Sequence, residues 1–150
     1  MSEKKLDGKE LDELLNSKSG LLGVSGVSAD MREVVGAMRT GNQRAQLAFD
    51  IFIHRLRAGI GSMLATLDGA DAIVFTGGIG ENSPEVRAAT CSNFAFLSLA
   101  LDLAKNSAKP GNADISTPHS TVRILVLTAQ EDWAIARECW KLSSHASVAC

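Results

Sequence analysis

The chain has 150 residues, of which 45% are hydrophobic and 21% charged, with a formal net charge of −2. This composition is ordinary for one globular domain, and the small net charge excludes a broad electrostatic attraction to nucleic acid or to an anionic membrane. The N-terminal residues are too polar for a secretory signal, and no apolar run is long enough to span a membrane. We therefore expect a cytoplasmic protein, whose separated cysteines Cys91, Cys139 and Cys150 are reduced, mostly structural thiols rather than zinc ligands.

The first elements are short and helical. Leucines spaced three and four residues apart predict an amphipathic helix over residues 9–17. Residues 20–28 read GLLGVSGVS, and their periodicity does not decide between a short strand and an irregular turn. After them, Ser28 or Asp30 can cap a helix over residues 31–38.

A long helix is predicted over about residues 42–67, ended by Asp68 and Gly69. Its apolar residues recur at three- and four-residue steps, as expected for a helix that buries one face. We expect it to be the main packing element of the domain. The apolar stripe consists of Ala45, Ala48, Phe49, Phe52, Ile53, Leu56, Ile60, Met63, Leu64 and Leu67.

The sequence DAIVFTGGIGENSPEVR contains the most informative pattern. It predicts a buried strand over residues 72–76, a glycine turn over residues 77–80, and a helix over residues 84–93 capped by Asn82 or Ser83. A strand, a glycine turn and a helix N-terminus together can present backbone N–H groups to an anion such as a nucleotide phosphate. The pattern is neither a Walker loop nor a complete GxGxxG, so it leaves phosphate binding and a plain tight turn both open.

The last part of the chain contains one more clear strand. Residues 94–103 are ambiguous, residues 105–120 are predicted as a loop, residues 122–127 as a strand, and residues 131–142 as a helix. Strands separated by helices predict a single α/β domain over residues 1–150. Because two or three strands make a thin sheet, we expect the remaining strands of that sheet to lie elsewhere.

Several segments together resemble the acetate and propionate kinase family. The matching strings are LLNSKSGLLGVSGVSADMREV (14–34), FTGGIGENSPEVR (75–87), LDLAKN (101–106) and VRILVLTAQEDWAIAREC (122–139), and the resemblance extends over about residues 11–140. It implies part of a ribonuclease H-like domain of the actin-like ATPase superfamily, with a thin, mostly parallel sheet packed by helices. The chain resembles the C-terminal part of the family's second, nucleotide-side domain.

The resemblance also implies a chemistry, which is Mg²⁺-dependent phosphoryl transfer from ATP to acetate, giving acetyl phosphate and ADP. Glu131 matches a family carboxylate that helps to hold Mg²⁺, a cation that prefers oxygen ligands. The resemblance assigns no catalytic residue to this chain. The residues that match the ATP-binding positions are Asp30, Met31, Arg32, Gly77, Gly78, Ile79 and Asn82.

Each of these polar residues also has a simpler interpretation. Asp30 and Asn82 can be helix caps without a ligand, and Arg32 can be a solvated residue of a first helical turn. Glu131 and Asp132 can merely complement the dipole of the last helix. The residues alone do not decide between these interpretations and nucleotide binding.

The chain also departs from the family. Residues 127–132 read LTAQED where the family has a Pro-Thr-Asn-Glu-Glu type string, and the family's N-terminal domain is absent, together with its phosphate loop, acyl-phosphate-binding arginines and catalytic aspartate. We therefore expect a C-terminal kinase portion that is inactive alone. The alternatives are a non-catalytic nucleotide-binding or interaction module, a split subunit that needs a separate N-terminal half, and a truncated product.

Two further properties follow from the resemblance alone. Full-length members are homodimers, so the helix predicted over residues 42–67 is expected to be partly interfacial. The choice between acetate, propionate and butyrate is not determined by this sequence, because the acyl pocket lies in the part that is missing.

Overall fold

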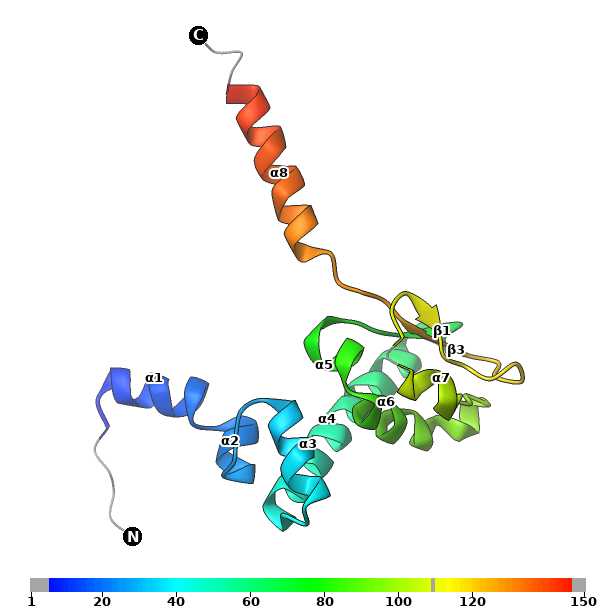
Figure 1. Ribbon diagram of the computed structural model, residues 1–150, viewed down its shortest axis with the longest axis horizontal. Helices are drawn as coiled ribbons and strands as arrows, with labels where there is room; N and C mark the ends of the chain where they lie inside the picture. Colours follow the sequence, from blue (N-terminus) through cyan, green and yellow to red (C-terminus); the bar gives the residue numbers. More distant parts are fainter. Residues whose placement is uncertain (1–5, 109, 147–150) are drawn as a thin grey trace.

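The computed structural model describes residues 6–108 and 110–146, but of residues 144–146 it describes only the backbone (Figure 1). Cys150 lies outside the described residues. Helices and a small sheet form a body from which the first and last helices extend in different directions. The elements are α1 (Gly8–Ser17), α2 (Gly20–Ser25), α3 (Met31–Arg39), α4 (Gln43–Leu67), β1 (Ala72–Phe75), α5 (Gly77–Asn82), α6 (Pro84–Cys91), the 3₁₀ helix η1 (Ser92–Leu97), α7 (Leu103–Ser107), β2 (Ala113–Asp114), β3 (Arg123–Val126) and α8 (Glu131–Ala146).

The helices predicted from periodicity are present, and polar side chains cap them. Asp7 and Glu10 form a capping box at α1, and the Asn42 side chain accepts from the backbone N–H groups of Arg44 and Ala45 at the start of α4. The long helix is confirmed within one residue at its start. The last helix, α8, continues to Ala146, beyond the predicted end.

Residues 20–25 form a helix, which corrects the expected short strand or irregular turn. Gly20, the first residue of this helix, and Gly26, its C-cap, have φ angles of 59° and 66°, which glycine adopts without steric cost. Leu21 and Val24 of α2 pack against the core cluster formed by α3 and α4. The segment is therefore helical because α4 offers it an apolar surface.

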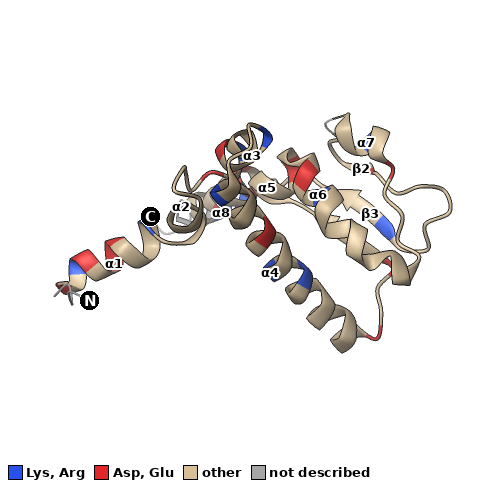
Figure 2. Ribbon diagram, turned by 90° about the horizontal axis from the view of Figure 1, so that it is seen from below, with Lys and Arg blue, Asp and Glu red and all other residues tan. Residues whose placement is uncertain are grey.

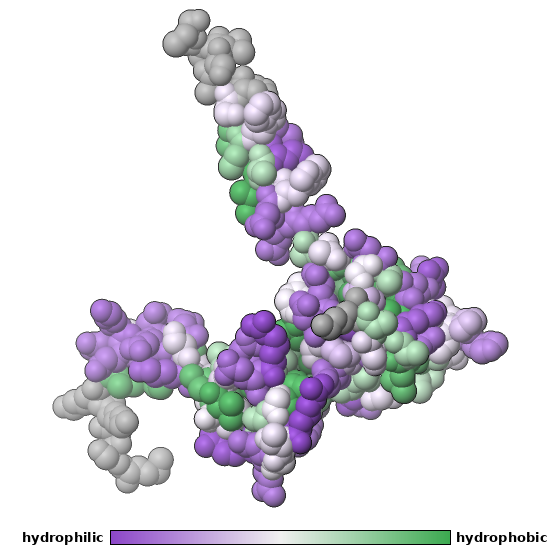
Figure 3. All heavy atoms as spheres, viewed as in Figure 1, coloured by the Kyte–Doolittle hydropathy of each residue, from purple (hydrophilic) through white to green (hydrophobic). Residues whose placement is uncertain are grey.

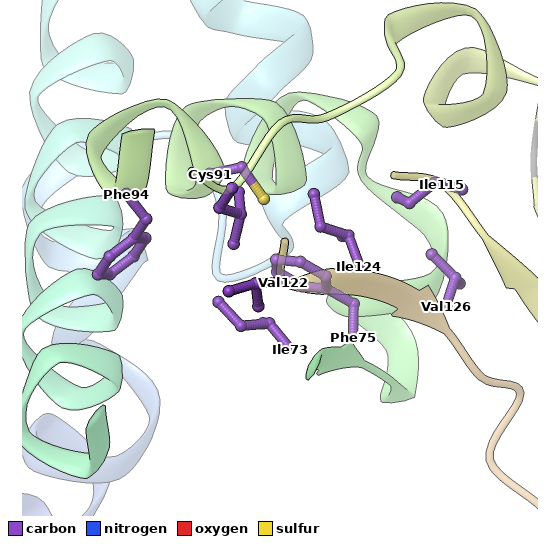
Figure 4. Packing of buried hydrophobic residues seen from close by; sticks show 9 residues of the cluster. Ile73, Phe75, Cys91, Phe94, Ile115, Val122, Ile124 and Val126 are labelled. Carbon is purple, nitrogen blue, oxygen red and sulfur yellow. The ribbon is translucent and has the colours of Figure 1, made fainter. Parts of the chain in front are cut away.

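The sheet has the order β1-β3-β2. β1 and β3 pair in parallel over four residue pairs, from Ala72 with Arg123 to Phe75 with Val126, whereas β2 and β3 pair antiparallel over only two. One face of the sheet is buried under α6 and η1, and Figure 4 shows how the apolar side chains pack there. On the other face Val74 is 48% exposed, so this face of the thin sheet is only partly covered.

The expected loop over residues 105–120 is also corrected, because it contains structure. Asp102 caps α7 by accepting from the backbone N–H groups of Ala104 and Lys105. β2 follows, with Ala113 opposite Val126. A two-residue strand has no periodicity to read, so only its pairing with β3 reveals it. The helix predicted to reach residue 93 ends at Cys91 and continues as η1.

Two apolar clusters form the core. One lies between the sheet and α6–η1, and the other joins α3, the first half of α4 and Val86 of α6. Cys91 belongs to the first cluster, and burial raises the pKa of its thiol to about 11, which makes it a structural thiol at neutral pH. In the second half of α4, Met63 and Leu67 are 57% and 69% exposed. The apolar stripe of α4 is thus buried along only part of its length.

Charged residues of both signs occur along α3 and α4 (Figure 2). Among the described residues, no helix is long and apolar enough to cross a membrane.

Candidate functional site

A cleft of about 680 Å³ lies between two segments that are distant in the sequence. We call Ala29, Asp30, Met31 and Arg32, at the start of α3, the first wall, and Gly78, Ile79, Asn82 and Ser83, on and after α5, the second wall. Six of the seven residues matched to ATP-binding positions line this cleft. Gly77, the seventh, precedes the second wall and is not among the lining residues.

The first wall is formed where α3 begins. Asp30 is the N-cap of α3, and its carboxylate accepts from the Arg32 backbone N–H at 2.8 Å. Met31 is only 3% exposed and belongs to the core cluster beneath α3. The wall therefore combines a buried apolar residue with two polar ones, and the core beneath holds its backbone in place.

The loop before the first wall is attached to α4. The Arg44 guanidinium donates to the Val24 carbonyl at 2.9 Å and to the Gly23 carbonyl at 3.1 Å, which satisfies the C-terminal end of α2. Ser28 Oγ then accepts from the Asp30 backbone N–H at 3.0 Å. These contacts determine where Asp30 enters α3.

Asp30 and Arg32 also form an ion pair. The Arg32 Nε lies 3.0 Å from Asp30 Oδ1 and 3.1 Å from Oδ2, while 80% of the Arg32 side chain stays exposed. Hydrogen bonds from the side chain and the backbone of Arg32 lower the pKa of Asp30 from 3.8 to about 2. The carboxylate is therefore ionised at neutral pH. The simpler interpretations also hold in part, since Asp30 caps α3 and the Arg32 side chain is largely exposed to solvent.

The glycine turn is the start of a short helix rather than an open loop. Gly77 has a φ of 72°, which only glycine adopts readily, and the six-residue helix α5 begins there. Its backbone N–H donates to Glu81 Oε1 at 2.9 Å. The first N–H of the turn is thus already bound to a carboxylate of the same helix, so it is not a free donor for a phosphate.

The second wall rests on a buried arginine. Arg87 of α6 is 1% exposed, and its Nη1 donates to the carbonyls of Gly80 and Glu81 at 2.7 and 2.8 Å. Its Nε and Nη2 donate to the side chain and the carbonyl of Asn106 on α7, at 2.7 and 2.9 Å. The Asn106 side chain in turn donates to the Pro84 carbonyl at 3.0 Å. Arg87 thereby joins α5, α6 and α7. Burial lowers the pKa of its guanidinium.

The polar ends of the second wall have partners of their own. Asn82 Nδ2 donates to the Gly78 carbonyl at 2.9 Å within α5. Ser83, rather than Asn82, caps α6, because its hydroxyl accepts from the Val86 backbone N–H. The Asn82 side chain remains exposed at the cleft.

Glu131 lies outside the cleft lining, in the exposed first turn of α8 beside Asp132. Among the described residues, no three potential metal ligands of the types His, Cys, Asp and Glu come together. Mg²⁺ typically takes one or two protein carboxylates and completes its shell with phosphate oxygens and water. In the described part of the chain Glu131 is thus an exposed carboxylate outside any cluster of potential metal ligands, and its role towards Mg²⁺ stays a prediction.

Three residues at the site are missed by sequence reasoning, namely Glu81, Arg87 and Asn106. Each lies within a string that matches the family, but none has a pattern that signals its contacts. Their hydrogen bonds join residues from 4 to 48 positions apart. The one available sign in the sequence is an arginine on the apolar face of a helix. Such an arginine predicts a hydrogen-bond network, since a buried guanidinium needs several acceptors.

Known proteins of one family resemble this chain in sequence. The model of the Acetokinase family matches residues 1–137. Among curated relatives, the acetate kinase of Nostoc punctiforme is 59% identical over 134 residues, covering 89% of this chain and 33% of the relative. That of Rippkaea orientalis is 61% identical over 131 residues, covering 87% of this chain and 32% of the relative. The chain thus spans about a third of the length of these relatives.

Solved structures of the same family share the fold. The crystal structure of Porphyromonas gingivalis acetate kinase superposes with a TM-score of 0.80 at 39% identity, covering 89% of this chain and 34% of that one. Acetate kinase from Entamoeba histolytica gives a TM-score of 0.82 at 33% identity, covering 89% and 36%. The fold is therefore a portion of the actin-like ATPase type, as expected from the motifs. From the family match, the identities and these superpositions, we conclude that the chain belongs to the acetokinase family.

Proposed function

We propose that this chain is the nucleotide-side portion of an acetate kinase and that its cleft takes the adenosine part of ATP or ADP. The observation that supports this proposal is that Asp30, Met31 and Arg32 line one cleft together with Gly78, Ile79 and Asn82. The cleft volume lies within the range of about 300–1,000 Å³ that is usual for small-molecule sites. Met31 and Ile79 offer apolar surface, and Arg32 and Asn82 offer polar groups that can orient the ligand.

In this proposal Glu131 would hold Mg²⁺ through a carboxylate oxygen, and the cation would supply positive charge that neutralises the phosphate groups. The reaction of the whole protein is then transfer of the γ-phosphoryl group of ATP to acetate, or to another short carboxylate. Such transfer depends on groups that position and neutralise the phosphoryl group from both sides. Since this chain supplies one side, we expect it to have no measurable turnover alone.

Calorimetric titration with MgATP and MgADP tests the cleft, after circular dichroism has shown that the chain is folded. We expect saturable binding that weakens about tenfold in Arg32→Ala, because a charged group that contacts the ligand is lost. Asn82→Asp tests the second wall in the same way. Arg39→Ala is the matched control, since Arg39 pairs with Glu85 and does not line the cleft. A folded chain that binds neither nucleotide refutes a nucleotide site in this chain alone.

A hydroxamate assay for acyl phosphate tests the expected inactivity. The purified chain, with ATP, Mg²⁺ and acetate, should produce no acyl phosphate above the blank. Turnover that persists after removal of contaminating enzymes would show that this chain carries a complete active site.

A second candidate function is that of a split subunit, and a specific surface favours it. An apolar groove of about 520 Å³ runs along the second half of α4 and beside β1, lined by residues that include Leu56, Ile60, Met63, Leu67 and Ala72. β1 pairs only with β3 among the described strands, so its other edge is open. An open edge beside an apolar groove fits an added strand. We propose that the occupant is the complementary part of an acetate kinase chain.

Mixing the chain with the unmatched two thirds of Nostoc punctiforme acetate kinase tests this candidate. We expect a one-to-one complex in size-exclusion chromatography and recovery of kinase activity. Met63→Asp should prevent assembly, because it places a charge in the groove. Leu15→Asp is the control, since Leu15 is equally exposed but lies on α1. No complex, or a complex unaffected by Met63→Asp, would contradict this use of the groove.

A further inference from the structure

One carboxylate oxygen connects the glycine turn with the segment that leads to α8. Oε1 of Glu81 accepts from the backbone N–H of Gly77 and from that of Ala129, both at 2.9 Å. Gly77 opens α5, and Ala129 lies between β3 and α8. Glu81 is half-buried, so this bridge stands at the surface next to the second wall.

The segment from Leu127 to Gln130 has few other attachments. Within the described part of the chain, the Leu127 N–H donates to the Phe75 carbonyl at 2.9 Å, and the Thr128 N–H donates to Asn112 Oδ1 at 3.0 Å. All four residues of the segment are exposed. α8 then extends away from the body, with apolar and polar residues on different flanks (Figures 1 and 3). The direction in which α8 leaves the body therefore depends on these few bonds.

We propose that Glu81 is a positioning residue that sets the spacing between the second wall of the cleft and the start of α8, and with it the place of Glu131. A hydrogen bond from a backbone N–H to a carboxylate is shorter and stronger than one to a neutral acceptor. The bond to Ala129 joins residues 48 positions apart, so it determines tertiary spacing rather than local helix geometry. The importance of Glu131 for Mg²⁺ rests on the proposed function, but the bridge itself does not.

The same bridge occupies one backbone donor of the glycine turn. The anion at the Gly77 N–H is the carboxylate of Glu81 itself. A phosphate at this N–H would have to displace Glu81 and would thereby release Ala129. The proposal therefore predicts that nucleotide binding leaves the Gly77 N–H protected.

Hydrogen exchange in the wild-type chain without nucleotide tests the bridge directly. The Ala129 amide should exchange about tenfold or more slowly than the Gln130 amide, relative to their intrinsic rates, as expected for a bond to a charged acceptor. Equal protection factors at Ala129 and Gln130 would overturn the proposal. This measurement needs no variant and therefore does not depend on whether a variant folds.

Variants of Glu81 test the positioning role. Glu81→Ala removes the acceptor, whereas Glu81→Gln keeps an oxygen at the same place and removes only the charge. Both tryptophans of the chain, Trp133 and Trp140, lie on α8, so tryptophan fluorescence anisotropy reports the motion of this helix. We expect lower anisotropy and about tenfold faster Ala129 exchange in Glu81→Ala, with Glu81→Gln between that variant and the wild type, because its amide oxygen still accepts but carries no charge.

Glu85→Ala is the matched control, because among the described residues the Glu85 side chain bonds to Arg39 and Ser83 rather than to the segment after β3. It should leave both readouts unchanged. A folded Glu81→Ala variant with wild-type anisotropy and Ala129 exchange would overturn the positioning role.

Titration with ATP, with and without Mg²⁺, connects the bridge to the proposed function. Glu81→Ala should keep the Mg²⁺-free affinity within about twofold and lose most of the gain that Mg²⁺ produces, about tenfold. A full Mg²⁺-dependent gain in this variant would overturn the link to Glu131. If the wild type binds no nucleotide at all, the proposed function fails, while the exchange and anisotropy data still decide the bridge.

Discussion

The first wall of the cleft rests on an apolar core, whereas the second wall rests on hydrogen bonds. Beneath the first wall, Met31 packs into the cluster that also contains Val34 and Phe49. The second wall lies on a six-residue helix whose C-terminal carbonyls are bound by buried Arg87. Apolar packing stabilises the first wall through closely filled volume, whereas a buried arginine stabilises the second wall through hydrogen bonds with fixed directions. We therefore expect the two walls to respond differently to substitution.

The largest effect is expected where the first wall loses its core. Phe49→Ala should lower the free energy of unfolding by about 3–5 kcal/mol, through lost apolar burial and the cavity that remains. Urea denaturation followed by circular dichroism measures this change. Phe96→Ala is the control, because Phe96 is 75% exposed and its loss should cost less than about 1 kcal/mol. Equal costs for the two variants would refute the assignment of the core.

The second wall should be broken by Arg87→Met. The carbonyls of Gly80, Glu81 and Asn106 and the Asn106 side-chain oxygen then lose their donor. An unsatisfied buried group costs about 1–3 kcal/mol, and because two of these four contacts are only part-buried, we expect a loss near the lower end, about 3–4 kcal/mol overall. ATP affinity should fall as well. Arg57→Met is the control, since Arg57 donates to the Ala89 carbonyl outside the cleft.

For Arg57→Met, thermal denaturation should show a loss of stability, while calorimetry shows unchanged nucleotide affinity. If Arg87→Met were to lose stability but keep full affinity, Arg87 would have no role in holding the second wall.

Alanine substitutions at two adjacent glycines distinguish the effect of backbone strain from the effect of a side chain in the cleft. Gly77→Ala places an L-residue at a φ of 72°, which should cost about 1–2 kcal/mol. Gly78 has no such φ, and a Cβ built there meets no atom within 4 Å, so Gly78→Ala should keep full stability. Because Gly78 lines the cleft, its variant instead tests how closely the nucleotide approaches, through the dissociation constant. Equal losses of stability in both variants would contradict the left-handed turn.

The smallest effect concerns the charge of the first wall. The pKa of Asp30 is lowered to about 2, so its stabilising contribution is complete above about pH 4 and is lost as the pH falls towards about 2. Asp30→Asn keeps a good N-cap but removes this pH dependence. Because the ion pair with Arg32 is exposed, the change in melting temperature should be small.

Asp114→Asn provides the comparison for this acid effect. Asp114 accepts from Ser116 and Arg123, and its pKa is lowered to about 2 for the same kind of reason. Both variants should show a shallower decrease of melting temperature between about pH 4 and about pH 2. If both variants keep the wild-type decrease of melting temperature, these two carboxylates do not cause it.

Much of the fold and part of the site can be predicted from the sequence. The stripe of α4, the strand at Ala72–Phe75 and the cap at Asp30 follow from periodicity and capping rules, which act over a few residues. The motif strings lead to the family and to the residues that line the cleft. The nucleotide that these residues are proposed to bind, and the role of Glu131 towards Mg²⁺, stay predictions.

Other features depend on contacts between distant segments. Residues 20–25 are helical because α4 lies beneath them, and β2 exists because β3 offers it a partner. The bonds of Glu81 to Ala129 and of Arg87 to Asn106 join segments whose proximity no local pattern encodes. Propensity and periodicity act along the chain, whereas a buried guanidinium or a bridging carboxylate finds its acceptors or donors only after the chain has packed.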